Sequence, residues 1–217
     1  MISWEAVTSE CARPYRGGPV PKGTIQIFND ETTESMPVPQ AVARYIRGSK
    51  QFGETPYASV QELKDAVRAV TGMVARSRAL RMLERRDYSY KELLVRLTNE
   101  GFDKATCVSI LNDMRSSGVL DDTRFAEVFI RSKLSSGWGI ERIRRELASR
   151  GVDTERLPGW PYDYADPDDE FERAMGIASR KRVREPNAYA KLVRFLMGRG
   201  FSTDVSMRAA KQTLMGD

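Results

Sequence analysis

The sequence predicts an all-α protein made of tandem three-helix repeats in an elongated array, preceded by a small, partly irregular N-terminal extension. Three observations support this fold class. A glycine-centred pattern recurs at intervals of 50 and 49 residues, apolar residues keep a helical period over most of the chain beyond residue 59, and the composition is 41% hydrophobic and 30% charged. With 217 residues, the chain is long enough for one or two domains.

The repeat is centred on Gly101, Gly151 and Gly200. A leucine lies four residues before each glycine and an apolar residue directly follows it: Leu97 and Phe102, Leu147 and Val152, Leu196 and Phe201. This pattern is typical of a helix that ends at a glycine in the left-handed conformation, which lets the next apolar residue fold back onto the last turn. We therefore expect each leucine to contact the apolar residue of its own block.

The first 58 residues are expected to form the N-terminal extension. It should be flexible up to about residue 22, with a short strand at 24–28 and a helix within 37–47. These residues carry no copy of the repeat, so they are assigned apart from it.

The first repeat, with a preceding helix, is expected at residues 59–118. Ser59 and Glu62 form a capping box, and the helical period that follows fits one long helix or two. Ser89 and Glu92 form a second capping box, which opens a helix that ends before Gly101. A further helix should start near Asp103 and stop at Gly118.

The second repeat, at residues 119–160, is expected to be shortened. One helix should open at Asp122 and another should run over 140–150, but three prolines after Val152 forbid a continuous third helix. Trp160, Tyr162 and Tyr164 in this stretch can serve a binding loop or pack a linker, and we favour packing.

A linker rich in proline and aspartate is expected at residues 161–169, followed by the third repeat at 170–217. Its helices should start near Glu170, include 189–196, and resume after Ser202.

Composition excludes several classes of protein. Histidine is absent, which removes the commonest general base and metal ligand, and Cys11 and Cys107 are too far apart in sequence for a metal-binding pair, so we expect reduced structural thiols. Glu54 stands where a phosphate-binding loop needs lysine. No apolar run approaches the roughly 20 residues of a membrane span. We expect no catalytic residue, no cofactor, no metal and no membrane association, and a cytoplasmic location.

Basic residues are the remaining candidates for function. The net charge is +5, and residues 173–217 carry 10 basic against 3 acidic side chains. In the helix over 140–150, the period places Arg142, Arg145 and Ser149 outward, with Arg144 nearer the boundary. A denser run follows further along the chain: Arg180, Lys181, Arg182 and Arg184.

These seven cations are candidate partner-binding residues. A solvated helix surface explains the arginines of the 140–150 helix as well, because Glu141 with Arg145 and Arg142 with Glu146 have the spacing of ion pairs within a helix. The run from 180 to 184 lies at a helix end, where cations also favour the helix dipole.

An ordered set of residues carries a family resemblance. It comprises Ala79, Leu80, Leu83, Arg86, Ser89, Glu92, Leu93 and Leu97; then Gly118, Leu120, Asp121, Asp122, Arg124, Phe125 and Ala126; then Gly139, Arg142, Ile143, Glu146, Leu147 and Gly151; and finally Phe195, Leu196, Arg199, Gly200 and Phe201. Over about residues 74–215 the chain resembles the RecX family of recombination regulators. It departs from that family in the proline-broken helix and in the long N-terminal extension.

The resemblance implies a crescent of three-helix repeats. It further implies binding to the RecA recombinase, chiefly as its filament on DNA, and restraint of the ATP hydrolysis, strand exchange and co-protease activity of RecA. Asp121 and Asp122 belong to the family signature, although we expect them to act as caps of the helix that follows.

The function expected from the sequence is therefore that of a monomeric regulator of the RecA filament, with single- or double-stranded DNA as a further partner. The alternative is a stand-alone helical DNA-binding module whose basic faces contact phosphates. An affinity for bare DNA that falls steeply with salt would favour the alternative.

Overall fold

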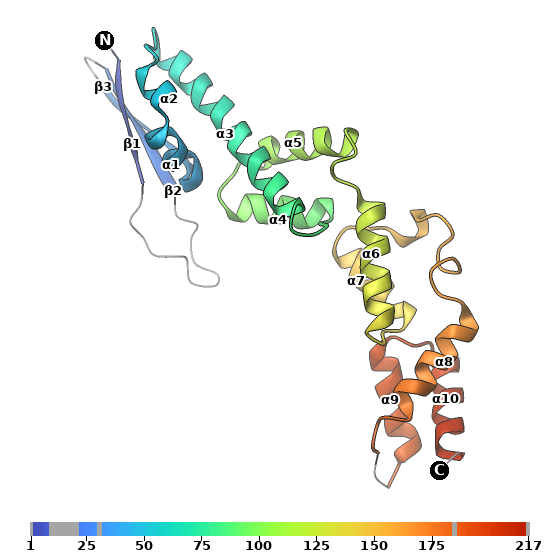
Figure 1. Ribbon diagram of the computed structural model, residues 1–217. Helices are drawn as coiled ribbons and strands as arrows, with labels where there is room; N and C mark the ends of the chain where they lie inside the picture. Colours follow the sequence, from blue (N-terminus) through green and yellow to red (C-terminus); the bar gives the residue numbers. More distant parts are fainter. Residues whose placement is uncertain (1, 9–21, 30–31, 184–185, 216–217) are drawn as a thin grey trace. The chain divides into compact units, whose positions relative to one another are not determined.

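The computed structural model describes residues 2–8, 22–29, 32–183 and 186–215 (Figure 1). The chain divides into two compact units, Met1–Leu120 and Asp121–Asp217. The described residues form ten α-helices, one short 3-10 helix and one three-stranded sheet. The predicted class, helical repeats with a small N-terminal extension, is confirmed.

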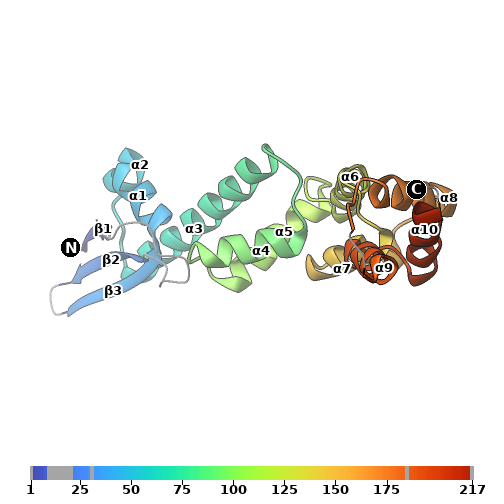
Figure 2. The same cartoon turned by 90° about the horizontal axis from the view of Figure 1, so that it is seen from below.

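The N-terminal unit begins with an antiparallel sheet of strands β1 (Ser3–Val7), β2 (Lys22–Asn29) and β3 (Thr32–Pro39), in the order β1-β2-β3. Ile25 and Ile27 of β2 are buried, and helix α1 (Gln40–Gly48) contacts all three strands (Figures 1 and 2). A Cβ atom on Gly23 would lie 2.4 Å from the Cβ atom of Ala43, so glycine allows this close approach.

The sheet is larger than the sequence predicts. Only the strand at 24–28 is expected, whereas the structure adds β1 and β3 and replaces part of the expected flexible stretch with β1. Strand β3 contains Pro37 and Pro39, which weaken a strand signal but are tolerated at a sheet edge. Pairing with β2, rather than its own periodicity, accounts for that strand. Residues 9–21 lie outside the described residues.

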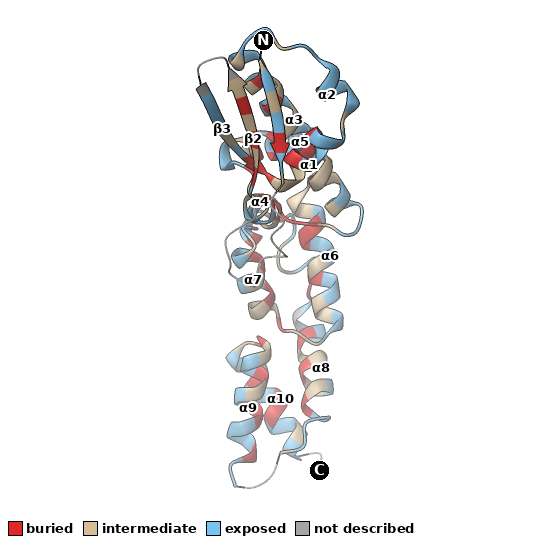
Figure 3. Cartoon of the chain, turned by 90° about the vertical axis from the view of Figure 1, so that its left-hand side faces the viewer, coloured by how far each residue is buried: buried red, intermediate tan, exposed pale blue. Residues whose placement is uncertain are grey.

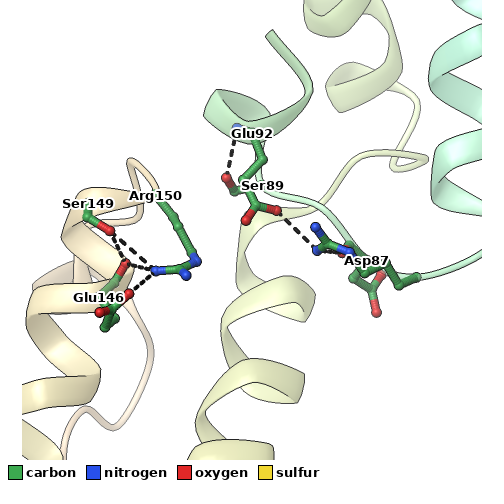
Figure 4. Close-up of polar contacts among 7 residues, drawn as sticks. Asp87, Ser89, Glu92, Glu146, Ser149 and Arg150 are labelled. Atoms are coloured by element: carbon green, nitrogen blue, oxygen red, sulfur yellow. Dashed lines mark hydrogen bonds and ion pairs between the residues drawn. The ribbon is translucent and has the colours of Figure 1, made fainter. Parts of the chain in front are cut away.

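A short helix, α2 (Lys50–Glu54), follows α1. Next comes a single long helix, α3 (Val60–Leu83), which settles the choice between one helix and two. Helices α4 (Tyr90–Asn99) and α5 (Lys104–Ser116) complete the first repeat. The Ser59 hydroxyl accepts from the backbone N–H of Glu62, as expected of an N-cap. The Ser89 hydroxyl accepts in the same way from the backbone N–H of Glu92 (Figure 4). The sheet and these helices share one hydrophobic core that runs in sequence from Ala6 to Leu120.

The C-terminal unit contains α6 (Asp122–Ser135), α7 (Ile140–Ser149), α8 (Pro167–Ala178), α9 (Ala188–Arg199) and α10 (Thr203–Met215). It has two hydrophobic cores, one in the second repeat and one in the third. Buried residues lie on the sides of α9 and α10 that face each other (Figure 3).

The predicted break after Val152 is confirmed. Only a 3-10 turn, η1 (Thr154–Arg156), and further turns follow before α8. Trp160 and Tyr164 pack against the core of the second repeat, whereas Tyr162 is 72% exposed. Helix α8 starts three residues before the expected Glu170, because Asp166 caps it and Pro167 suits its first turn.

The repeat glycines adopt the predicted conformation. The φ angles of Gly101, Gly151 and Gly200 are 91°, 79° and 94°. In each block, the N–H of the apolar residue donates to the leucine carbonyl five positions earlier, at 3.2, 3.0 and 3.2 Å. All three helices therefore end in the Schellman arrangement that the sequence indicates.

Candidate partner-binding surface

Helix α7 is anchored through its N-terminus to the third repeat. The N–H of Gly139 donates to the Arg199 carbonyl at 3.0 Å, and the N–H of Glu141 donates to the Gly200 carbonyl at 3.1 Å. The N–H of Ile140 donates to the buried carboxylate of Glu170 at 3.1 Å. These bonds satisfy donors that the first turn of a helix leaves without a partner, so they fix where α7 presents its side chains.

Two glycines make this junction possible. A Cβ atom on Gly139 would lie 2.2 Å from the carbonyl carbon and oxygen of Gly200, and one on Gly200 would lie 2.2 Å from the Cβ atom of Arg142. The two backbones pass too closely for any side chain at either position. The pairing of Gly139 with Gly200 across the repeats is not readable from the sequence, where each looks like an ordinary helix-end glycine.

The expectation that Arg142 points outward is wrong. Its side chain is half-buried, and its guanidinium lies 3.7 Å from the centre of the Trp138 ring. A cation over an indole ring is stabilised by the ring quadrupole, so Trp138 holds Arg142 against the junction. Arg142 and Trp138 act together as part of the scaffold, a role that the sequence analysis missed for Trp138.

Arg144 and Arg145 are the exposed arginines of α7. Arg144 pairs with Glu141 at 2.8 Å, and Arg145 donates through Nε to the Glu141 carbonyl at 3.2 Å. The predicted pairs of Glu141 with Arg145 and of Arg142 with Glu146 are therefore wrong, because Glu141 pairs with Arg144 and Glu146 pairs with Arg150. Ser149 is exposed as expected.

Arg150, at the end of α7, contacts both its own helix and α6. Its Nη1 donates to the carbonyl and the carboxylate of Glu146 and to the Ser149 hydroxyl (Figure 4). Its guanidinium also lies 4.9 Å from the centre of the Phe129 ring. The cations that α7 offers to a partner are thus Arg144 and Arg145.

The second basic run follows the end of α8. Arg180, Lys181 and Arg182 are exposed, and Arg184 lies outside the described residues. The Lys181 ammonium lies 5.0 Å from the centre of the Phe195 ring on α9. This contact between Lys181 and Phe195 therefore holds the basic run beside α9.

Asp121 has the capping role expected of it. Its carboxylate accepts from the backbone N–H groups of Thr123 at 2.8 Å and Arg124 at 3.2 Å. Asp122 lies in the first turn of α6, where a negative charge favours the helix dipole. Both residues of the signature therefore contribute to the start of α6.

Cys107 is fully buried, and desolvation raises the pKa of its thiol to about 11. A reactive cysteine needs a lowered pKa, so Cys107 is a core residue rather than a nucleophile. In the described parts of the chain, no three histidine, cysteine or carboxylate side chains are grouped so as to hold a metal ion. Among the described helices, none combines the length and the apolar character needed to cross a membrane.

The arrangement defines a class: a tandem helical-repeat protein that presents cations on its helices. Comparison with known families gives three matches in chain order. Residues 75–113 match the first three-helix domain of RecX, residues 121–155 the second, and residues 168–209 the third. Together these ranges cover more than half of the chain.

Several relatives support the same grouping. The Regulatory protein RecX of Chromohalobacter salexigens is 41% identical over 130 residues, which cover 58% of this chain and 84% of that protein. The Regulatory protein RecX of Vibrio vulnificus is 35% identical over 134 residues, covering 60% and 86%. The chain belongs to the RecX family of regulatory proteins.

Solved structures agree with the fold. The crystal structure of a regulatory protein RecX aligns with a TM-score of 0.62 at 20% identity, covering 87% of this chain and 94% of that chain. RecX from Lactobacillus salivarius aligns with a TM-score of 0.55 at 20% identity, covering 66% and 97%. At this identity the likeness concerns the fold alone.

Proposed function

We propose that this chain is a non-catalytic regulator that binds the RecA recombinase, chiefly as its filament on DNA, and mainly inhibits its ATP hydrolysis, strand exchange and co-protease activity. The observation that carries the proposal is the succession of three RecX three-helix domains in one chain. The regulator acts as a monomer in the cytoplasm, with DNA as a further partner.

The exposed arginines of α7 are our candidates for part of the recombinase contact. Arg144 and Arg145 lie on a helix that is anchored at its N-terminus by three hydrogen bonds, so their positions do not depend on a partner. Their local pairing with Glu141 is a surface interaction worth about 0.2–1 kcal/mol, which a complementary partner can replace. Arg142 supports this surface from the Trp138 ring, and the run from Arg180 to Arg184 is the second candidate contact.

ATP hydrolysis by RecA on single-stranded DNA tests the proposal. The parent chain should inhibit hydrolysis, and Arg144→Glu with Arg145→Glu should relieve most of that inhibition, since reversed charges repel a complementary surface. The matched control is Arg68→Glu with Lys104→Glu, which makes the same change in net charge at exposed residues of the N-terminal unit. Arg68 also loses a pair three residues away, as Arg144 does.

Two results would count against the proposal. A parent chain that leaves RecA hydrolysis unchanged would contradict the function itself. Equal inhibition by the parent and the α7 double variant at physiological salt would move the contact away from α7, to the run from Arg180 to Arg184. Circular dichroism should show the same helix content in every variant.

A further inference from the structure

A groove in the N-terminal unit runs between helices α1 and α3, which contact each other (Figure 1). It encloses about 350 Å³. Its described lining residues come from both helices: Ala41, Arg44 and Tyr45 from α1, and Met73, Val74, Ser77, Arg78 and Arg81 from α3. The matches to the RecX domains begin at residue 75, so the α1 wall and part of the α3 wall precede the part that defines the family.

Each wall is a helix face that the core leaves unused. Helix α1 buries three residues on one side: Val42, Ala43 and Ile46. Arg44 and Tyr45 fall on the opposite side of the same helix and are exposed. On α3, Met73, Ser77 and Arg81 follow one another at intervals of four residues, so they form a single row along the groove.

The residue types in the groove are those of a protein interface. Tyr45 and Met73, on facing walls, are 45% and 47% exposed, although both are large and apolar. Tyrosine, methionine and arginine are enriched at the centres of protein interfaces, where lysine is depleted. The described lining contains all three enriched types and no lysine.

The charge of the groove selects an acidic partner. None of its described lining residues is acidic, and three are arginines. Arg78 pairs with Glu100 at 3.6 Å, whereas Arg44 and Arg81, on opposite walls, form no ion pair with any described residue. Their guanidinium groups therefore have donors to offer to carboxylates, which they can bind through two parallel hydrogen bonds.

We propose that this groove binds an acidic segment of a protein partner, with one large apolar side chain between Tyr45 and Met73 and carboxylates on Arg44 and Arg81. Its volume lies near the lower end of the range for ligand pockets, about 300–1,000 Å³, which suits a side chain. A nucleic-acid strand would instead use a row of cations and open aromatic surfaces. An apolar floor gives phosphates no advantage, so the groove favours a peptide.

Nuclear magnetic resonance of the full chain, isotope-labelled at its methionine methyl groups, tests this site. The added ligand is a synthetic peptide of glutamates around a central phenylalanine, and Met73→Leu identifies the Met73 resonance. The peptide should shift the methyl resonance of Met73 by placing its ring beside the thioether. Met207, which lies on α10 of the other unit and is 46% exposed, should not shift.

Two altered peptides separate the anchor from the charge. Alanine in place of phenylalanine should weaken binding to the parent chain by about tenfold, because the apolar anchor is lost. Lysine in place of every glutamate should abolish the Met73 shift, since like charges then face Arg44 and Arg81. Both measurements use the unaltered protein, so they do not depend on how a variant folds.

Arg44→Glu with Arg81→Glu should weaken binding of the glutamate peptide by about tenfold or more, because reversed charges repel it. The matched control is Arg47→Glu with Arg76→Glu, which makes the same change in net charge on the same two helices at exposed residues outside the described lining. The control should weaken binding by less than about threefold, as screened charges beyond the contact do. Circular dichroism should show equal helix content in both.

Several results would overturn the proposal. They are an unmoved Met73 resonance at about 1 mM peptide, equal binding by the two double variants, and equal binding of the phenylalanine and alanine peptides. Displacement of the peptide by oligo-dT would assign the groove to nucleic acid. A Met73 shift that grows with protein concentration alone would assign it to a second copy of the chain. Inhibition of RecA is measured separately, so failure of this site leaves the proposed regulatory function standing.

Discussion

Gly200 meets two separate demands at the junction between the second and third repeats. Its φ angle of 94° lies in the left-handed region, and its Cα faces the backbone and Cβ atom of Arg142. The first demand is visible in the sequence as a helix-end signal, and the second arises only when α7 and α9 meet. The residue is therefore more constrained than its helix-end role requires.

Gly200→Ala should destabilise the chain by about 2 kcal/mol or more, because it combines backbone strain with a clash of 2.2 Å. Gly198→Ala, two residues earlier on the same helix, has no atom within 4 Å and should be neutral or stabilise by up to about 1 kcal/mol. Urea denaturation followed by circular dichroism measures both. Equal stability of the two variants would contradict the close contact.

Cys107 is protected by its place in the core of the N-terminal unit. With its pKa raised to about 11 by burial, the thiolate is scarce at pH 8 and the sulfur is shielded from reagents. Iodoacetamide at pH 8 should modify Cys107 only slowly, and modification should become rapid in denaturant. Site-resolved mass spectrometry distinguishes these rates, and rapid modification under native conditions would show that the thiol is accessible.

At the scale of the elements, side-chain caps set where several helices begin. Ser59, Ser89, Asp103, Asp121 and Asp166 each accept from backbone N–H groups in the first turn. At Asp103, the N–H of Thr106 donates to the carboxylate at 2.9 Å and holds the pKa of Asp103 below its ordinary value. Because the folded-state pKa is depressed, the cap stabilises the fold above the pKa of the unfolded chain, and this stabilisation is lost as pH falls through the folded-state pKa.

Asp103→Ala should therefore lower the free energy of unfolding by about 1 kcal/mol at pH 7. Asp103→Asn keeps a capping oxygen without a titrating group, so it should stay close to the parent at pH 7 and lose less stability than the parent in acid. Chemical denaturation at pH 7 and at pH 3 gives both differences. Parallel losses by the parent and Asp103→Asn on acidification would contradict the titration of this cap.

The sequence predicts those helices whose ends are marked by residues close together in the chain. Capping boxes at Ser59 and Ser89, and glycine ends at Gly101 and Gly151, depend on residues within one turn of each other, and the structure has them where expected. Strands β1 and β3 lack such signals, because each is held by pairing with β2. Long-range pairing is what local periodicity cannot report.

The same limit applies to the basic residues. The sequence places the arginines of α7 on a helix, but Arg142 is drawn inward by Trp138, which precedes the helix, and Arg144 takes the exposed place instead. Arg173 is an ordinary helical arginine in the sequence. The structure places it half-buried in one pocket with residues of α6 and α9, which are distant along the chain, so the sequence cannot show this position.

At the scale of the whole molecule, the N-terminal extension is part of a larger folded unit. Buried residues of its sheet and of α1 belong to the same core as α3, α4 and α5, whereas the second and third repeats have cores of their own. The matches to the three RecX domains begin at residue 75, so the sheet precedes the part that defines the family. The net charge of +5 favours approach to a polyanionic assembly such as a filament on DNA.

The most direct measurement compares partners for the whole chain. The labelled protein is titrated at physiological salt with RecA filaments on single-stranded DNA, with RecA alone and with the bare strand, and anisotropy gives each affinity. We expect the filament to bind at least tenfold more tightly than either component, with the bare strand showing the steepest loss of affinity as salt rises. Binding to the bare strand that equals binding to the filament would contradict a filament regulator and would identify a stand-alone DNA-binding module instead.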